Sequence, residues 1–174
     1  SNKKHIEKLY KNLEDKIKVI PHTLDLDEFQ IKSNSPNINN KIKFIYGGNM
    51  PMIDKEDSIL PFLDALVDLQ NNHTELYQKI EIQFYFNSDW MIKEIRNRNL
   101  SNIYFNKKIQ PIKFNNIASK HDYLLIFLPD YLKDYLITKN IDYLPIKKPI
   151  IICAKKGRAS EKIKLNKIGA HLDP

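Results

Sequence analysis

The sequence predicts an α/β domain built on a doubly wound parallel sheet, and three observations lead to this prediction. Short apolar runs recur along the chain, and stretches of helical spacing separate them. Residues 123–128 and 149–153 are continuously apolar, which is typical of strands buried on both faces of a parallel sheet. Two glycines, Gly47 and Gly48, follow the first run directly. Strands that alternate with helices form right-handed βαβ units, and such sheets bind ligands beyond the carboxyl ends of their strands.

The expected elements follow one another from residue 41 to the end of the chain. Alternating or continuous apolar runs predict the strands, and Ser58 and Asp89 are expected to cap helices. The expected strands are residues 42–46, 79–86, 103–105, 123–128 and 149–153, and the expected helices cover 58–69, 89–99, 115–120, 137–144 and 160–168.

The first 40 residues differ from the rest. Residues 5–14 have helical spacing, and residues 16–20 alternate as a short strand. The polar stretch 34–40 contains Ser-Pro-Asn, which is typical of a linker. We therefore expect residues 1–40 to form a lead-in helix, a strand and a connector, and residues 41–174 to form the compact domain.

The composition is that of a globular domain with a basic surface. The 174 residues are 42% hydrophobic and 28% charged, with a net charge of +7. Positive charge attracts phosphates of every kind. A platform for RNA bases would need aromatic residues interleaved with arginine, and the arginines are only Arg96, Arg98 and Arg158. Nucleic acid is therefore not an expected partner.

The compartment is predicted from cysteine usage and sorting signals. Cys153 is the single cysteine, which excludes an internal disulfide and suits a reducing compartment. No apolar run approaches the roughly 20 residues that span a bilayer, and no signal peptide is visible. We expect a cytoplasmic protein, and the wealth of Asn, Lys and Ile indicates a bacterial one. The histidines form no metal-ligand pattern, and His73 and His121 are expected in surface turns.

Gly47 and Gly48 are the first candidates for a functional role. Glycines at this place let a backbone approach a phosphate closely and leave amide N–H groups available as donors. The pair belongs to neither a G-x-G-x-x-G motif nor a Walker loop, because no Gly-Lys-Ser/Thr follows. A tight turn without a ligand explains the pair equally well.

Charged residues after the strand 123–128 are the second candidates. Asp134 and Asp142 lie eight positions apart, with Lys139 between them near a predicted helix start. A lysine there can meet a diphosphate as a mobile point charge. An acid one turn further on can accept both hydroxyls of a ribose. The alternative is a surface helix with solvated charges.

Several segments resemble, in order, the C-terminal half of GT-B glycosyltransferases. Residues 19–29, VIPHTLDLDEF, are similar to the connector that precedes that half. Residues 44–66 resemble its first strand, glycine turn and helix. Residues 123–130 and 138–150 resemble its buried strand and its Lys-x-x-acid-Tyr-Leu segment, and residues 169–174 resemble the glycine motif that comes next. The resemblance covers nearly the whole chain.

This resemblance implies a Rossmann-like nucleotide-sugar-binding domain that is one half of a GT-B fold, with the N-terminal acceptor domain absent. In the family, the residue matching Lys139 contacts the donor diphosphate, and the acid matching Asp142 holds the ribose hydroxyls. Asp134 falls where the first acid of a paired motif faces the donor sugar. Asp134 and Lys139 are therefore the implied catalytic residues.

Further donor contacts are implied on the same grounds. Lys55 is the candidate match to a cation that follows the glycine turn in the family, and the loop from Lys107 to Ile109 would lie along the base. Both acids depart from the family, which prefers Glu, and each reaches about one methylene less far. The implied donor-binding set is Gly47, Gly48, Lys55, Lys107, Ile109, Asp134, Thr138, Lys139 and Asp142.

The implied reaction moves a sugar from a nucleoside diphosphate sugar to a saccharide or lipid-linked acceptor in surface polysaccharide synthesis. No cofactor and no metal is required. The chain alone is expected to bind the donor without transferring sugar, and a peripheral contact with the inner membrane through the absent half stays open. Two alternatives also stay open: half of a sugar-nucleotide epimerase, and a non-catalytic α/β module that binds a nucleotide or a protein.

Overall fold

A computed structural model provides the structure of the chain. It describes residues 40–49, 59–135 and 137–174, together with residues 9, 10, 16, 18 and 20. The expected helix over 5–14, the strand over 16–20, the connector and linker that follow, Lys55 and Ser58 lie wholly or almost wholly outside the described residues. The division of the chain at residue 40 therefore stays a prediction.

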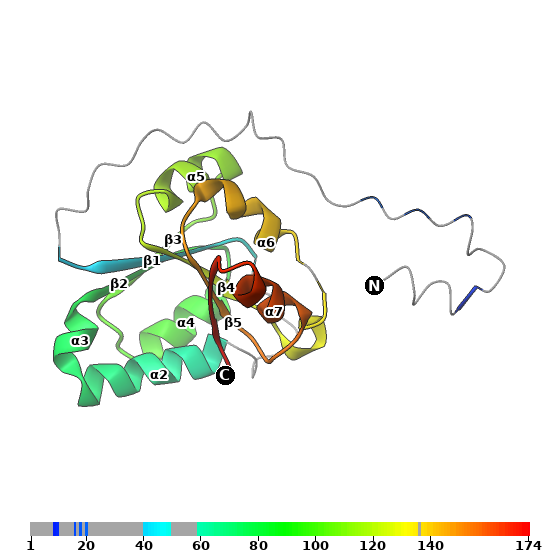
Figure 1. Ribbon diagram of the computed structural model, residues 1–174. Helices are drawn as coiled ribbons and strands as arrows, with labels where there is room; N and C mark the ends of the chain where they lie inside the picture. The colour runs from blue at the N-terminus through cyan, green and yellow to red at the C-terminus, as the bar shows by residue number, and fades with distance from the viewer. Residues whose placement is uncertain are drawn as a thin grey trace.

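A six-stranded sheet forms the centre of the fold (Figure 1). Its strands are β1 (Ile42–Gly47), β2 (Ile80–Tyr85), β3 (Ile103–Asn106), β4 (Tyr123–Phe127), β5 (Ile150–Cys153) and β6 (Gly169–Leu172). The spatial order is β3-β2-β1-β4-β5-β6, and every neighbouring pair is parallel. The chain steps outward from β1 to β3 and then returns to the other side of β1. This order is that of a doubly wound Rossmann-like sheet, so the predicted fold class is confirmed.

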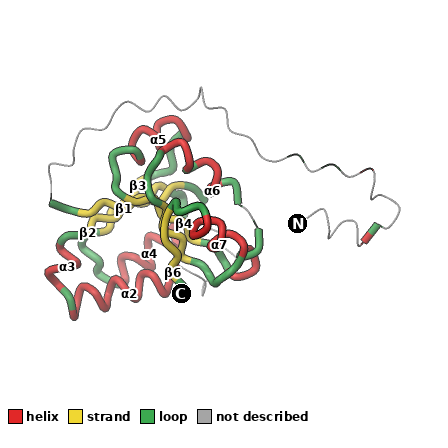
Figure 2. The backbone as a smooth tube through the Cα atoms, viewed as in Figure 1, coloured by secondary structure: helices red, strands yellow, loops and turns green. Residues whose placement is uncertain are grey.

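Helices cover both faces of the sheet (Figure 2). They are α2 (Ile59–Asn72), α3 (Thr74–Gln78), α4 (Asp89–Asn97), α5 (Pro111–Ala118), α6 (Lys139–Asp142) and α7 (Arg158–Leu165), with the 3-10 turns η3 (Asp130–Leu132) and η4 (Leu144–Ile146). Parallel strands need such crossovers, because the chain must return to the same end of the sheet before the next strand begins.

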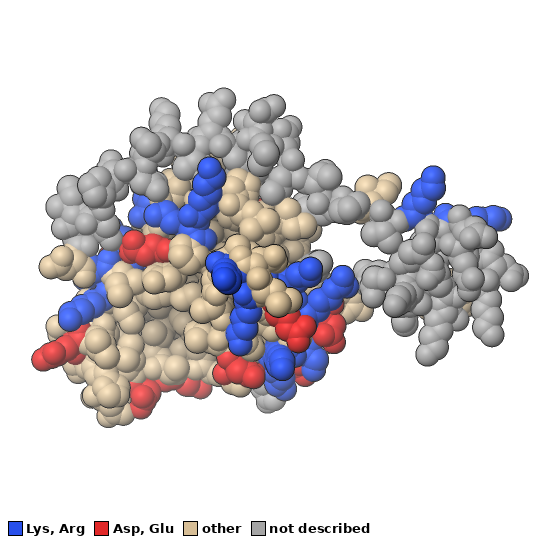
Figure 3. Space-filling view, viewed as in Figure 1, with Lys and Arg blue, Asp and Glu red and all other residues tan. Residues whose placement is uncertain are grey.

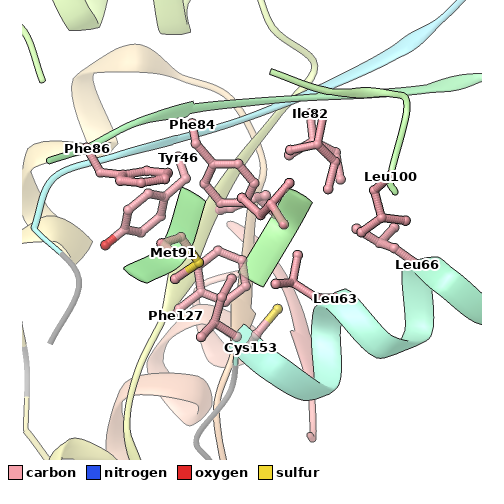
Figure 4. Close-up of a cluster of buried hydrophobic side chains, with 14 of the residues drawn as sticks. Tyr46, Leu63, Leu66, Ile82, Phe84, Phe86, Met91, Leu100, Phe127 and Cys153 are labelled. Atoms are coloured by element: carbon pink, nitrogen blue, oxygen red, sulfur yellow. The ribbon is translucent and has the colours of Figure 1, made fainter. Parts of the chain in front are cut away.

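One core lies between the sheet and α2 and α4 (Figure 4). Helix α2 contributes Leu63 and Leu66, and α4 contributes Met91. They pack against strand residues that include Tyr46 and Phe84. Aromatic rings fill much of this layer, because Phe127 has ring contacts with Tyr46, Phe62 and Phe84.

The second core lies on the opposite face, under α5, α6 with η4, and α7. Its strand residues alternate with those of the first core, as the period of two in a strand requires: Ile45 precedes Tyr46 in β1, and Leu124 precedes Leu125 in β4. Phe114 of α5, Tyr143 and Ile163 of α7 join this cluster. The buried central strands explain why residues 123–128 are continuously apolar.

Most of the expected elements are confirmed, and the differences are shifted helix ends and two short elements that the sequence did not predict. Ser88, not Asp89, caps α4, because its hydroxyl accepts a hydrogen bond from the Met91 amide at 3.3 Å. Helix α5 begins at Pro111, four residues before the expected start, with proline in the first turn where no amide donor is needed. The short helix α3 and the edge strand β6 were not predicted.

The expectation of a surface turn is confirmed for His73 and wrong for His121. His73 is exposed. The His121 side chain is only 4% exposed, and its Nδ1 lies 2.9 Å from the carbonyl oxygen of Ile117. Burial lowers the pKa of this imidazole, so the neutral ring occupies the core edge. Cys153 is buried as predicted, and burial raises the pKa of its thiol to about 12.

On one face of the molecule, the charged side chains of the described residues are spread out and do not form one basic block (Figure 3). On the face drawn in Figure 3, lysines and arginines stand singly or in small groups, and in the lower part they alternate with acidic residues. In the part of the chain that the structure describes, no helix has the length and apolar character needed to cross a membrane.

Candidate functional site

The candidate site lies where the carboxyl ends of β1 and β4 meet. β1 lies between β2 and β4, so the strand order reverses beside it. Ligands of open α/β sheets bind at this switch point, because the loops there diverge to opposite faces and leave a crevice. Gly47 ends β1, and Gly48 follows it at this position.

The two glycines form a turn whose amides are already used within the protein. The N–H of Gly47 donates to the hydroxyl of Tyr143 at 3.2 Å, and the N–H of Gly48 donates to the carbonyl of Tyr85 at 3.0 Å. The expectation that these amides are available to a phosphate is therefore not met. The glycines instead leave room, since neither carries a side chain where neighbouring groups approach closely.

Tyr143 fixes the turn from the second core. Its hydroxyl accepts from the N–H of Gly47 and lies 3.4 Å from the carbonyl oxygen of the same residue, to which it can donate. The ring stacks on Phe114 with centroids 6.1 Å apart. A Cβ at Gly47 would overlap the Phe114 ring. Glycine at position 47 therefore permits the packing that holds Tyr143 against the strand end.

Lys139 reaches across the end of the sheet. It begins α6, on the face of the second core, yet its ammonium lies 3.9 Å from the ring centroid of Tyr46, which belongs to the first core. A Cβ at Gly48 would lie 2.9 Å from the Lys139 Nζ. Gly48 also has a φ of 125°, a conformation that favours glycine. Gly48 thus leaves the passage through which Lys139 reaches Tyr46.

The electrostatics of Lys139 are unusual for a lysine. Burial lowers the pKa of its ammonium to about 7, the carboxylate of Asp142 acts in the opposite direction, and the ammonium of Lys108 lowers the pKa further. The face of the Tyr46 ring offers the cation partial compensation for its lost water. Burial is also the main cause that raises the pKa of Tyr46 and of Tyr143, so both hydroxyls stay protonated.

Lys108 approaches the same turn from the other side. It follows β3, and its Nζ donates to the side-chain oxygen of Asn49 at 3.1 Å. Its backbone N–H donates to the side-chain oxygen of Asn87, also at 3.1 Å. The Asn49 carbonyl in turn accepts from the Tyr46 hydroxyl at 2.9 Å. The loops after three neighbouring strands are therefore linked through Lys108.

Asp134 makes its contacts on another element. Its Oδ1 accepts from the amide of Arg158 at the start of α7, 3.4 Å away. Its charge also acts on Lys133. The structure shows no contact between Asp134 and Lys139 among the described residues, so its catalytic role stays a prediction.

The remaining predicted site residues fall into three groups. Asp142 lies one turn after Lys139 and interacts with it electrostatically. Thr138 and Lys107 are exposed, whereas Ile109 is half-buried and packs against the second core. Lys55 lies outside the described residues. The structure thus brings together Gly47, Gly48, Lys139 and Asp142.

Sequence reasoning missed the partners that build this arrangement. Tyr46, the aromatic residue before the glycine pair, stood inside the expected strand 42–46 without a role of its own. Tyr143 and Lys108 stood inside predicted segments without a role of their own. Two features of the sequence point toward these partners. One is an aromatic residue directly before a glycine pair. The other is a tyrosine four residues after the lysine, a spacing that places both side chains on one face of a helix.

Chemically, the arrangement can hold a polyanion. A half-buried ammonium on Lys139, a second ammonium on Lys108 and the carboxylate of Asp142, which can accept hydroxyl hydrogen bonds, lie near the glycine turn. Three His, Cys, Asp or Glu side chains positioned to hold a metal ion do not occur among the residues that the structure describes.

Comparison with known proteins agrees with this fold. No protein-family model matches the sequence, and no curated protein is similar enough to match it. A solved glycosyltransferase from Rickettsia africae matches with a TM-score of 0.65 at 20% identity, over 100% of this chain and 48% of that one. This chain therefore spans about half the length of that enzyme.

Two further solved structures are more distant. The UDP-forming trehalose-phosphate synthase from Burkholderia xenovorans matches with a TM-score of 0.47 at 10% identity, over 64% of this chain and 29% of that one. The E. coli heptosyltransferase WaaC, solved with ADP-2-deoxy-2-fluoro heptose, matches with a TM-score of 0.47 at 6% identity, over 76% of this chain and 36% of that one. The fold is that of one half of a GT-B glycosyltransferase, as the resemblance in the sequence implies.

Proposed function

We propose that this chain binds a nucleoside diphosphate sugar at the carboxyl ends of β1 and β4 and serves as the donor half of a glycosyltransferase. The observation that carries the proposal is the position of Lys139. Its ammonium is held over Tyr46 beside Gly48, at the switch point of the sheet. A lysine is rarely desolvated unless an anion or a reaction needs it there.

The proposed role of Lys139 is electrostatic. As the glycosidic bond to the donor breaks, negative charge grows on the departing diphosphate. A fixed cation at this point stabilises the transition state more than the ground state, because the charge it faces is larger there. Burial strengthens the interaction, since fewer waters screen it. In this scheme no metal or other cofactor is required.

Asp142 is proposed to hold the ribose. It follows Lys139 by three positions, so both side chains lie on neighbouring parts of one helical face. A carboxylate can accept both ribose hydroxyls while the lysine meets the diphosphate. The charge of Asp142 also favours the protonated form of Lys139. In the proposed complex, the carboxylate that binds the ribose therefore also favours the charged form of the lysine that meets the diphosphate.

The wider reaction is proposed from the resemblance. The sugar would move to a saccharide or lipid-linked acceptor bound by an N-terminal domain, in the synthesis of a bacterial surface polysaccharide by a cytoplasmic enzyme, with any membrane contact made through that domain. Asp134 would face the donor sugar. The match to a chain about twice as long is consistent with a second half of this kind.

Calorimetric titration of the chain with UDP, GDP and ADP tests the proposal. We expect saturable binding of at least one of them. Lys139→Met should weaken that binding by about 1.5–3 kcal/mol, the usual cost of a lost charge-assisted hydrogen bond.

Lys120→Met is the matched control, because Lys120 is exposed and lies just before β4, at the amino ends of the strands and so on the side of the sheet opposite to the candidate site. Unchanged affinity in Lys139→Met would contradict the assignment of the diphosphate. Binding of none of the three nucleotides would contradict the proposed function and favour an α/β module that binds a protein.

A further inference from the structure

Lys108 is held in place more firmly than an ordinary exposed lysine. Its backbone N–H donates to Asn87, which follows β2, and its ammonium donates to Asn49, which follows β1. Because β3, β2 and β1 are adjacent in the sheet, this side chain extends past the end of β2 to reach the glycine turn. The Asn87 contact fixes the start of the side chain, and the Asn49 contact fixes its end.

The two lysines approach the turn from opposite sides. Lys139 comes from α6, which follows β4, and Lys108 comes from the loop after β3. The ammonium of Lys108 is close enough to lower the pKa of Lys139. Among the described residues, the carboxylate of Asp142 is the group that raises this pKa. In the part of the chain that the structure describes, two ammonium groups and one carboxylate leave an excess of positive charge at the turn, and an anion bound between the two lysines would relieve their mutual repulsion.

We propose that Lys108 is a second cation of the phosphate site, closing on the diphosphate from the side opposite to Lys139. The inference rests on the proposed function and deepens it, because two cations on either side of the turn select a diphosphate over a monophosphate. On binding, the ammonium of Lys108 exchanges its Asn49 contact for a phosphate oxygen, while the Asn87 contact keeps the loop in place. A single cation would distinguish the two anions less.

Inorganic pyrophosphate and inorganic phosphate are the probes that test this inference, because they lack the base, ribose and sugar. Both are titrated into the whole chain by calorimetry at pH 6, below the pKa of about 7 at which Lys139 loses its charge. At this pH the loss of Lys108 cannot be masked by a change in the charge of Lys139. The variants are Lys108→Met, Lys108→Arg, Lys139→Met and the control Lys120→Met.

The expected result is a selective loss. Lys108→Met should weaken pyrophosphate binding about tenfold and phosphate binding about twofold or less, as for one partly solvated charge contact. Lys108→Arg should restore most of the pyrophosphate affinity, and Lys120→Met should change neither affinity. The pH at which pyrophosphate binding is half lost should also rise in Lys108→Met, because removal of the neighbouring ammonium favours the charged form of Lys139.

Three outcomes separate this inference from the proposed function. Wild-type pyrophosphate affinity in Lys108→Met, with affinity lost in Lys139→Met, would overturn the second cation and leave the donor site standing. Equal losses for pyrophosphate and phosphate would overturn the selectivity. A wild-type chain that binds neither pyrophosphate nor any nucleoside diphosphate would overturn both the inference and the proposed function.

Discussion

The hydroxyl of Tyr143 lies within hydrogen-bonding distance of both backbone polar atoms of Gly47, 96 residues earlier in the chain, with N···O of 3.2 Å and O···O of 3.4 Å. This contact ties the end of β1 to the helix that carries Lys139 and Asp142. The position of the ammonium over Tyr46 therefore depends on a tyrosine whose own side chain is buried in the second core.

Removal of that hydroxyl should loosen the site. Tyr143→Phe keeps the stacking on Phe114 but leaves the Gly47 amide without its partner, so we expect a loss of about 1 kcal/mol in the free energy of unfolding. Urea denaturation measures the loss. Tyr104→Phe, at an exposed strand position, is the control and should have no effect. Equal stabilities for Tyr143→Phe and the wild type would show that the contact does not hold the turn.

Gly48→Ala should disturb both the backbone and Lys139. The φ of 125° is unfavourable for alanine, and the new Cβ would lie 2.9 Å from the Lys139 Nζ. We expect a destabilisation of about 1–3 kcal/mol. In a Lys139→Ala background the contact with the ammonium is gone and only the backbone strain remains, so the same substitution should cost less. Identical costs in the two backgrounds would contradict the close approach of Gly48 and Lys139.

Replacement of Lys139 by methionine should make the chain more stable, most of all at low pH. The pKa of the lysine falls from 10.5 in the unfolded chain to about 7 in the folded one, mainly through burial. Below pH 7 both states hold the proton, and the folded state bears the full cost of the buried charge. As the pH rises from about 7 to 10.5, only the unfolded state holds the proton, so wild-type stability rises with pH.

Thermal unfolding of Lys139→Met and the wild type between pH 6 and pH 10 measures this effect. The difference in Tm should favour Lys139→Met at pH 6 and shrink as the pH rises. Lys120→Met, which removes an exposed lysine, should show no such trend. A constant difference for Lys139→Met would show that its pKa is not lowered.

Donor binding should take up a proton at pH 8. Lys139 is largely neutral there, because its pKa is about 7, and a bound diphosphate favours the charged form. At pH 6 the lysine is already charged, so its uptake should vanish. Calorimetry of UDP, GDP or ADP binding in buffers of different ionisation enthalpy measures the number of protons. Lys139→Met corrects for protons of the nucleotide, and equal uptake by the two proteins would contradict the role of Lys139.

The fold could be predicted from the sequence largely because its central strands are buried on both faces. The run from Tyr123 to Leu128 has no other simple interpretation in a chain where strands and helices alternate. Strand β6 carries no such signal, because it is an edge strand whose residues alternate between half-buried and exposed. The short helix α3 also lacks a clear sequence pattern, since Tyr77 is the buried residue among its five.

The site could be predicted only in part. Lys139, Asp142 and the glycine pair stand in a motif, and the structure brings them together. The roles of Tyr46, Tyr143 and Lys108 depend on contacts between residues far apart in the chain, which no local spacing records. The glycine amides are a second example, because only the fold shows that the Tyr143 hydroxyl and the Tyr85 carbonyl already use them.

The most direct test of the central claim is an NMR titration of the Lys139 side chain in the free chain and with a saturating nucleoside diphosphate. Lys139→Met assigns the signal. The account predicts a pKa near 7 for the free protein and a clear rise when the diphosphate is bound, because the anion stabilises the ammonium. A nucleotide that binds and leaves the pKa of Lys139 unchanged would contradict the claim that this lysine meets the diphosphate.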